Sequence, residues 1–136
     1  RVKSLTAEYY DYLQFYRKNK DLSADAREKL KSALLHARNN FREVFVLDYV
    51  NWIRYESQGS FRLNKVTRDI LTRYCPFARE IRATLVNNPL YQNAFAKLET
   101  ENKKKTKRLQ TLYEKYEAAG GEITADFNEN LRFYQL

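Results

Sequence analysis

The sequence predicts an all-α protein, a helical bundle of about four main helices, two of them long, with short helices at the ends. Turn residues are scarce, because three glycines and two prolines occur in 136 residues, whereas a β-sandwich or barrel needs a turn about every 8–12 residues. Residues 23–58 contain neither glycine nor proline. Apolar side chains recur there at steps of three and four, the spacing of one helix face.

A chain of this length, 43% apolar, fits one domain with one core. We expect a single helical domain over 1–136, with an N-terminal helix or arm (1–22), a bundle (23–119) and a short C-terminal helix (120–136). In the competing interpretation, VFVLDYV at 44–50 is a buried strand, because β-branched and aromatic residues favour strands.

The first helix is predicted to begin at a Ser4 or Thr6 cap and to reach about Asn19. Its apolar stripe consists mostly of tyrosine, at positions Leu5, Tyr9, Tyr12 and Tyr16. One interpretation is core packing with the hydroxyls at the wet edge. The other is stacking on nucleic-acid bases.

The central helix is predicted as one element over 23–58, capped by Asp21 or Ser23 and closed by Gly59 and Ser60. Its stripe comprises Leu30, Leu34, Ala37, Phe41, Val44, Phe45, Trp52 and Tyr55. The half that reads VFVLDYVNWI is apolar on almost every side, so we expect neighbours to cover it from several directions.

Two short helices, 63–74 and 77–87, are expected on either side of Pro76. A second long helix is predicted over 90–119, ended by the two adjacent glycines at 120 and 121, and Thr124 caps a last short helix. The residues expected to be buried are Trp52, Phe45, Phe41, Leu34, Ile70, Ile81 and Leu98.

Signals of enzymatic chemistry are almost absent, so we expect no catalytic centre, no metal and no cofactor. The chain has one histidine, His36, and one cysteine, Cys75, which excludes the usual His/Cys zinc clusters and any internal disulfide and indicates an intracellular setting. There is no glycine-rich phosphate loop and no run of about 18 apolar residues to cross a membrane. Asp48, on the apolar helix, is expected to pair with an arginine or a tyrosine hydroxyl.

The net charge of +8 is concentrated, since residues 61–115 hold 13 basic and 5 acidic side chains. Such a block is typical of a surface that binds phosphates. The alternatives are a solvated face and a surface that binds an acidic protein or a membrane. The function that the basic block favours is sequence-independent binding of nucleic-acid phosphates, because these cations carry charge but read no base. The residues assigned to nucleic-acid contacts are Arg1, Lys3, Arg17, Lys18, Lys20, Arg62, Lys65, Arg68, Arg73, Arg79, Arg82, Lys103, Lys104, Lys105, Lys107 and Arg108.

Two alternative functions come from other classes. Residues 63–87 match a helix-turn-helix regulator in outline, with 77–86 as recognition helix and Arg79 and Arg82 at base edges. The other alternative is a helical protein-interaction module that binds no nucleic acid.

The tyrosine-rich first helix, two very long helices, few turn residues and many arginines together resemble the major coat proteins of filamentous archaeal viruses, the lipothrixviruses and rudiviruses. The likeness is of pattern over most of the chain and includes no short motif. It implies a four-helix bundle, a basic N-terminal arm and helices that wrap double-stranded DNA, and many copies stacked into a filament. The location would then be the virion, with the cytoplasm as the alternative.

Overall fold

The computed structural model describes residues 3–134, and its regular structure over that range is helical, as the sequence predicts. The helices are α1 (Leu5–Phe15), η1 (Tyr16–Lys18), α2 (Ala24–His36), α3 (Phe41–Arg54), η2 (Glu56–Gln58), α4 (Lys65–Tyr74), α5 (Arg79–Leu85), α6 (Pro89–Ala118) and α7 (Ala125–Phe133). The all-α class is therefore confirmed for the described chain.

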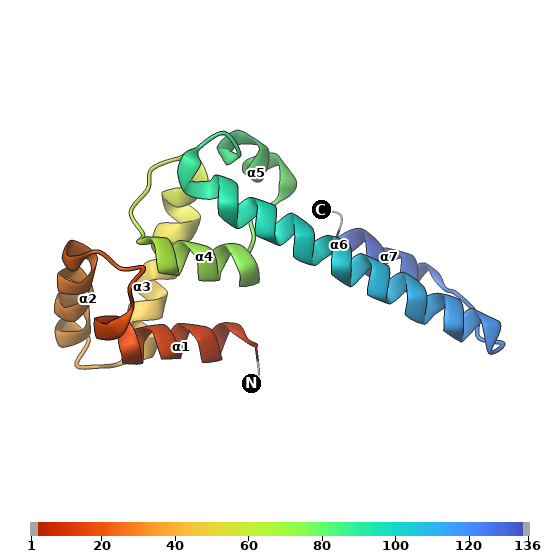
Figure 1. The fold of residues 1–136 in the computed structure, drawn as a ribbon, viewed down its shortest axis with the longest axis horizontal. Coiled ribbons are helices and arrows are strands. Elements are labelled where there is room, and N and C mark those ends of the chain that lie inside the picture. The colour runs from red at the N-terminus through yellow and green to blue at the C-terminus, as the bar shows by residue number, and fades with distance from the viewer. Residues whose placement is uncertain (1–2, 135–136) are drawn as a thin grey trace.

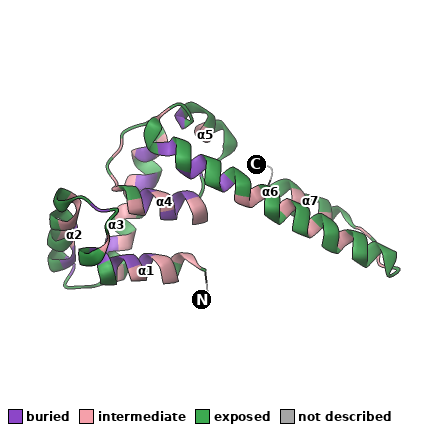
Figure 2. Ribbon diagram, in the orientation of Figure 1, coloured by how far each residue is buried: buried purple, intermediate pink, exposed green. Residues whose placement is uncertain are grey.

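The molecule has two parts, which we call the body (residues 3–101) and the arm (residues 102–134). Helices α1–α5 and the first part of α6 form the body, whereas the rest of α6 projects from it and α7 folds back along it (Figure 1). Within the described chain, the last buried residue is Leu98 (Figure 2). The predicted long helix 90–119 is thus confirmed, but half of it lies outside the core.

The prediction of one central helix over 23–58 is wrong, because the chain turns at residues 37–40. Arg38 and Asn39 have positive φ angles, 52° and 60°, and the Asn39 amide bonds to the Leu34 carbonyl at 2.8 Å to close α2. The Asn40 side chain then accepts from the amides of residues 42 and 43 and starts α3. Asparagine tolerates the left-handed conformation and caps helices well, so two adjacent asparagines replace the glycine of an ordinary helix turn.

The first of two aromatic cores confirms the packing interpretation of the tyrosine stripe. Tyr9 and Tyr12 of α1 and Tyr16 of η1 are buried against residues of α2, α3 and α4. The Tyr9 ring meets the rings of Tyr12 and Phe45 edge to face, with centroids 5.5 and 5.0 Å apart. These tyrosines cannot stack on bases, because their faces are already covered.

The second core joins α3, α4, α5 and α6 around Trp52. The Trp52 ring stacks on Phe77 at 3.9 Å, and its indole N–H donates to the Cys75 carbonyl at 2.9 Å. Tyr91 and Phe95 at the start of α6 complete this core. Of the seven residues predicted to be buried, Trp52, Leu34, Ile70 and Leu98 are buried, whereas Phe41, Phe45 and Ile81 are half-buried.

The apolar half of α3 is not covered from several directions, so that prediction is wrong. Val46 is 51% exposed, Leu47 60% and Ile53 50%. The helix packs one face on both cores and turns the other to solvent, because its neighbours α1, α2 and α4 leave these side chains uncovered.

Polar side chains set the helix starts. The predicted caps Ser4 and Ser23 each accept from the amide three residues on, at 3.1 Å. Asn64 caps α4 by accepting from the Thr67 amide, and Asn88 caps α6 by accepting from the Leu90 amide, both at 2.9 Å; neither was predicted as a cap. Gly59, predicted to close the central helix, has φ +85° and ends the short helix η2 that follows α3.

Candidate nucleic-acid interface

A cleft of about 610 Å³ lies where the start of α1, the end of α4 and the middle of α6 meet. Five cationic side chains and two acidic ones line it, together with a tyrosine: Lys3, Arg73, Lys104, Lys105, Arg108, Glu8, Glu101 and Tyr74. The cations come from three separate segments of the chain. We call this the basic cleft.

The basic residues between 103 and 108 of α6, which we call the lysine run, do not all face the basic cleft, because successive residues of a helix point in different directions. Glu101, Lys104, Lys105 and Arg108 follow one another at steps of three, one and three, which places them on one face. Lys103 and Lys107 are exposed and lie on another face. A third face is half-buried along α7, at Asn102, Thr106, Leu109 and Tyr113. The run is therefore divided between two faces that solvent reaches.

The floor of the basic cleft is held by an ion pair between α4 and α1. The Arg73 guanidinium donates to Glu8 Oε1 at 2.6 Å, and each side chain is about one-third exposed. Burial and the nearby Glu8 carboxylate raise the pKa of Tyr74, so its hydroxyl stays protonated at neutral pH. Glu8 thus neutralises the charge of Arg73, one of the five cations of the cleft, and fixes the position of its guanidinium.

The C-terminal end of α7 contacts one side of the lysine run. The Lys105 ammonium lies 5.6 Å from the centre of the Tyr134 ring, a cation–π contact. Lys104 and Arg108 are exposed at the cleft. With more cations than acids in a partly enclosed space, the site is suited to anions such as phosphate groups.

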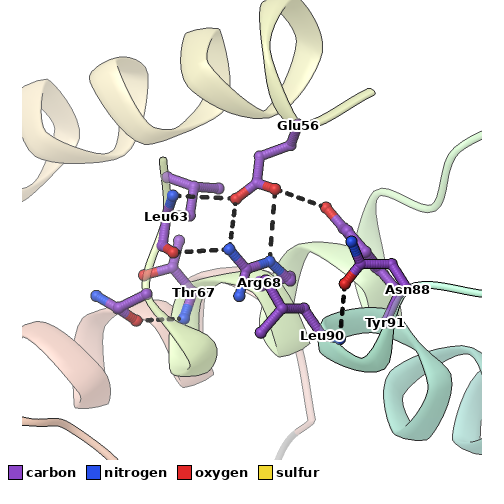
Figure 3. A network of polar contacts seen from close by, with 8 residues as sticks. Glu56, Leu63, Thr67, Arg68, Asn88, Leu90 and Tyr91 are labelled. Atoms are coloured by element: carbon purple, nitrogen blue, oxygen red, sulfur yellow. Dashed lines mark hydrogen bonds and ion pairs between the residues drawn. The ribbon is translucent and has the colours of Figure 1, made fainter. Parts of the chain in front are cut away.

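Arg68 was assigned to phosphate contacts, and this is wrong, because it lies in the core. It is 4% exposed and pairs with the buried Glu56 at 2.9 Å. The same guanidinium donates to the Leu63 carbonyl at 2.8 Å, while the Tyr91 hydroxyl donates to Glu56 at 2.8 Å (Figure 3). This network joins η2, α4 and α6, and it leaves Arg68 no access to a ligand.

The other assigned cations lie in separate places. Arg17, Lys18 and Lys20 follow α1 at its far end from the basic cleft (Figure 1). Arg62 stacks on the Tyr55 ring at 3.6 Å, and Lys65 is exposed nearby at the start of α4. Arg1 lies outside the described residues.

The predicted recognition helix 77–86 is shorter in the structure, since α5 spans Arg79–Leu85. The Arg82 guanidinium donates to the Phe77 carbonyl at 2.9 Å and lies 4.0 Å from Glu99. Arg79 is exposed on the same helix. Arg82 is therefore already bound within the protein, which weakens its assignment to a base edge.

The comparisons with known proteins give a family without an assigned activity. The family model that matches is described as Domain of unknown function (DUF8509), over residues 1–134. The chain belongs to this family. No curated protein and no solved structure matches it significantly. The functional argument for this DUF8509 chain therefore rests on its own side chains.

The groups considered for catalysis have ordinary surroundings. Burial raises the pKa of the Cys75 thiol, which keeps it protonated, and His36 is exposed on α2. Over residues 3–134, no three or more His, Cys, Asp and Glu side chains gather in a way that could hold a metal ion. Within the same range, no helix has both the length and the apolar content to cross a membrane.

Asp48 pairs with a tyrosine hydroxyl, one of the two outcomes expected for it. The Tyr9 hydroxyl donates to Asp48 Oδ2 at 2.5 Å. Burial raises the pKa of Asp48 to about 6, although the Tyr9 hydrogen bond opposes this change, and it raises the pKa of Tyr9 as well. This hydrogen bond joins α1 to α3, since Tyr9 belongs to α1 and Asp48 to α3.

Sequence reasoning missed Glu8, Tyr74 and Glu101 as members of the site. Glu101 carried a signal, because a glutamate four residues before Lys105 is the favourable orientation of a helical ion pair. Glu8 and Tyr74 carried none, since they are 66 positions apart and meet only through the packing of α1 on α4.

Proposed function

We propose that this protein binds double-stranded DNA through its phosphates, with the basic cleft as the main contact and without reading base sequence. The observation that carries the proposal is the convergence of Lys3, Arg73 and the α6 cations Lys104, Lys105 and Arg108 on one cleft. Three segments contribute to it, which a merely solvated basic helix would not require.

Phosphate contacts fix position and supply affinity but carry no sequence information. Most side chains that line the cleft are long and cationic. Apart from the Tyr74 hydroxyl, none of them carries an amide or hydroxyl group that could recognise a base edge. Base-edge recognition uses bidentate Arg, Asn or Gln contacts from an element that enters a groove. The composition of the cleft thus favours a structural, sequence-independent role over that of a regulator.

The finer form of the proposal is a coat, in which many copies lie along one duplex. It is supported by the charge of +8 on a chain of 136 residues. A viral origin for that coat stays a prediction from the resemblance to coat proteins of filamentous archaeal viruses.

The test is a titration of random-sequence duplex at about 50 and 200 mM salt with two matched variants, K104Q/R108Q and K103Q/K107Q. Both remove two charges four residues apart on α6, but only the first pair lines the basic cleft. We expect K104Q/R108Q to reduce the slope of log affinity against log salt by about 2, since each phosphate contact contributes about 0.9. K103Q/K107Q should change it by less than about 1.

Equal losses in both variants would show that net charge alone determines binding, and the cleft would lose its role. If the parent protein retains no DNA at the lower salt, the remaining hypothesis is a protein-interaction module that binds no nucleic acid. A short protected footprint, with about 1–3 kcal/mol lost per mismatched base pair, would favour the regulator. Negative-stain images of the DNA complex separate a continuous coat from discrete particles.

A further inference from the structure

Helix α3 turns apolar side chains to solvent from Val46 to Ile53, whereas the first turn of the same face carries the exposed charged residues Arg42 and Glu43. Val46, Val50 and Ile53 follow one another at steps of four and three, so they form a single stripe. Leu47 lies on one side of the stripe and Tyr49 on the other. All five are exposed, and we call them the α3 stripe.

The exposed apolar area of the α3 stripe is as large as the largest apolar patches on monomeric proteins. From the exposed fractions of its five side chains, the apolar surface is on the order of 500 Å², within the roughly 300–600 Å² of the largest patches on monomers, which are often functional. A standard interface buries roughly 800 Å² per partner. Two copies that cover each other's stripe would together bury about 1,000 Å², which is smaller than a standard interface but meets the lower limit for a specific one.

The charges at the ends of the α3 stripe make it complementary to itself. Glu43 and Arg54 are exposed and lie on the same side of the stripe, one in the first turn of α3 and one in the last. They are 11 residues apart, about 16 Å along the helix. When two copies of α3 lie antiparallel about a two-fold axis near residues 48 and 49, each Glu43 comes opposite the other copy's Arg54.

We propose that the α3 stripe is the interface of a symmetric homodimer, in which two α3 helices pack antiparallel. Such an interface is isologous, so a single surface with one acid and one base at its ends forms two identical ion pairs. The apolar stripe supplies the affinity, and the Glu43–Arg54 pairs set the antiparallel register. The occupant of the stripe is then a second copy of this chain.

The dimer does not depend on the DNA proposal, because the stripe belongs to α3 and the basic cleft to α1, α4 and α6. A DNA-free measurement therefore tests it separately. Sedimentation equilibrium of the full chain over a range of concentrations should show a reversible monomer–dimer equilibrium. A single monomeric species at every concentration would overturn the proposal.

Val46→Glu is expected to raise the dimer dissociation constant at least tenfold, because it places a carboxylate in the stripe. Val86→Glu is the matched control, since Val86 is also an exposed valine but follows α5. It should leave the dissociation constant unchanged. Circular dichroism of both variants checks that the helices remain. Equal effects from the two substitutions would place the interface elsewhere.

The register is tested by mixing two charge variants, Glu43→Arg and Arg54→Glu. Alone, each variant brings like charges together at both ends of the interface and should dimerise at least fivefold more weakly than the parent. Mixed in equal amounts, they should form a heterodimer close to the parent affinity, because both pairs are again opposite. Failure of the mixture to recover, with both variants folded, would overturn the antiparallel register and with it the proposed interface.

Discussion

The body and the arm contain the same kinds of residues in opposite surroundings. In the body, the aromatic rings stack out of solvent, as Trp52 does on Phe77. In the arm, Tyr113 and Phe127 also meet, with ring centroids 4.6 Å apart, but both are only half-buried. No residue from 102 to 134 is buried (Figure 2).

The cations of the two parts differ in the same way. Arg68 in the body is buried and neutralised by Glu56, whereas Lys104 and Arg108 keep their charge at the surface. We infer that the free energy of unfolding depends mostly on the body and the response to anions mostly on the α6 cations. The following substitutions separate the two contributions.

The largest effect is expected from Arg68→Ala, which should lower the free energy of unfolding by about 3–5 kcal/mol, because Glu56 would remain buried without its cation. Urea denaturation provides the measurement. The control is Arg62→Ala, which removes only a surface stack on Tyr55 and should cost about 0.5–1 kcal/mol. Similar losses in the two variants would mean that the buried pair does not hold the body together.

Asp48→Asn should stabilise the body at neutral pH. Folding raises the pKa of Asp48 to about 6, whereas an unfolded aspartate titrates near 3.9. The stabilising contribution of the protonated group is therefore complete below about pH 4 and is lost as the pH rises through about 6. We expect the variant to exceed the parent by on the order of 2 kcal/mol at pH 7 and to match it near pH 4.

Urea denaturation of Asp48→Asn and the parent between pH 4 and 8 measures this difference. Because asparagine keeps an oxygen for the Tyr9 hydroxyl, the hydrogen bond of the pair remains possible in the variant. A difference that stays constant with pH, or that favours the parent at neutral pH, would contradict the assignment.

Phe127→Ala should loosen the arm while the body stays intact. Its ring contacts Tyr113 and Tyr116, and such aromatic pairs contribute about 0.5–1.5 kcal/mol. Amide hydrogen exchange should therefore speed up in α7 and leave α1, α3 and α4 unchanged. Phe133→Ala, at a more exposed position of the same helix, is the control. Faster exchange in the body after Phe127→Ala would show that the two parts unfold together.

The smallest effect on stability per substituted residue is expected when Lys103, Lys104, Lys105, Lys107 and Arg108 are all replaced by Gln. The five side chains are exposed, so the free energy of unfolding should change by less than about 0.5 kcal/mol per site. The salt dependence of DNA binding should flatten at the same time. If this variant binds DNA as the parent does, the lysine run is only a solvated face.

The helical class and most helix bounds follow from local signals in the sequence. The tyrosine stripe of α1, the Ser4 and Ser23 caps and the span of α6 all depend on residues within one or two turns of each other. Periodicity also identified Trp52 and Leu34 as core residues. Such features can be read from sequence, because their energetics involve near neighbours along the chain.

Tertiary structure alone decided the rest. Asn39 and Asn40 permit a turn and a cap but do not require them, since asparagine also occurs inside helices at a small cost, and the packing of α2 on α3 decides between the two. Nothing in the sequence distinguishes Arg68 from a surface arginine, and only its burial beside Glu56 in the folded chain shows that it belongs to the core. Which side of α3 faces solvent, and which cations share a cleft, depend on contacts between residues tens of positions apart, and no local pattern encodes those.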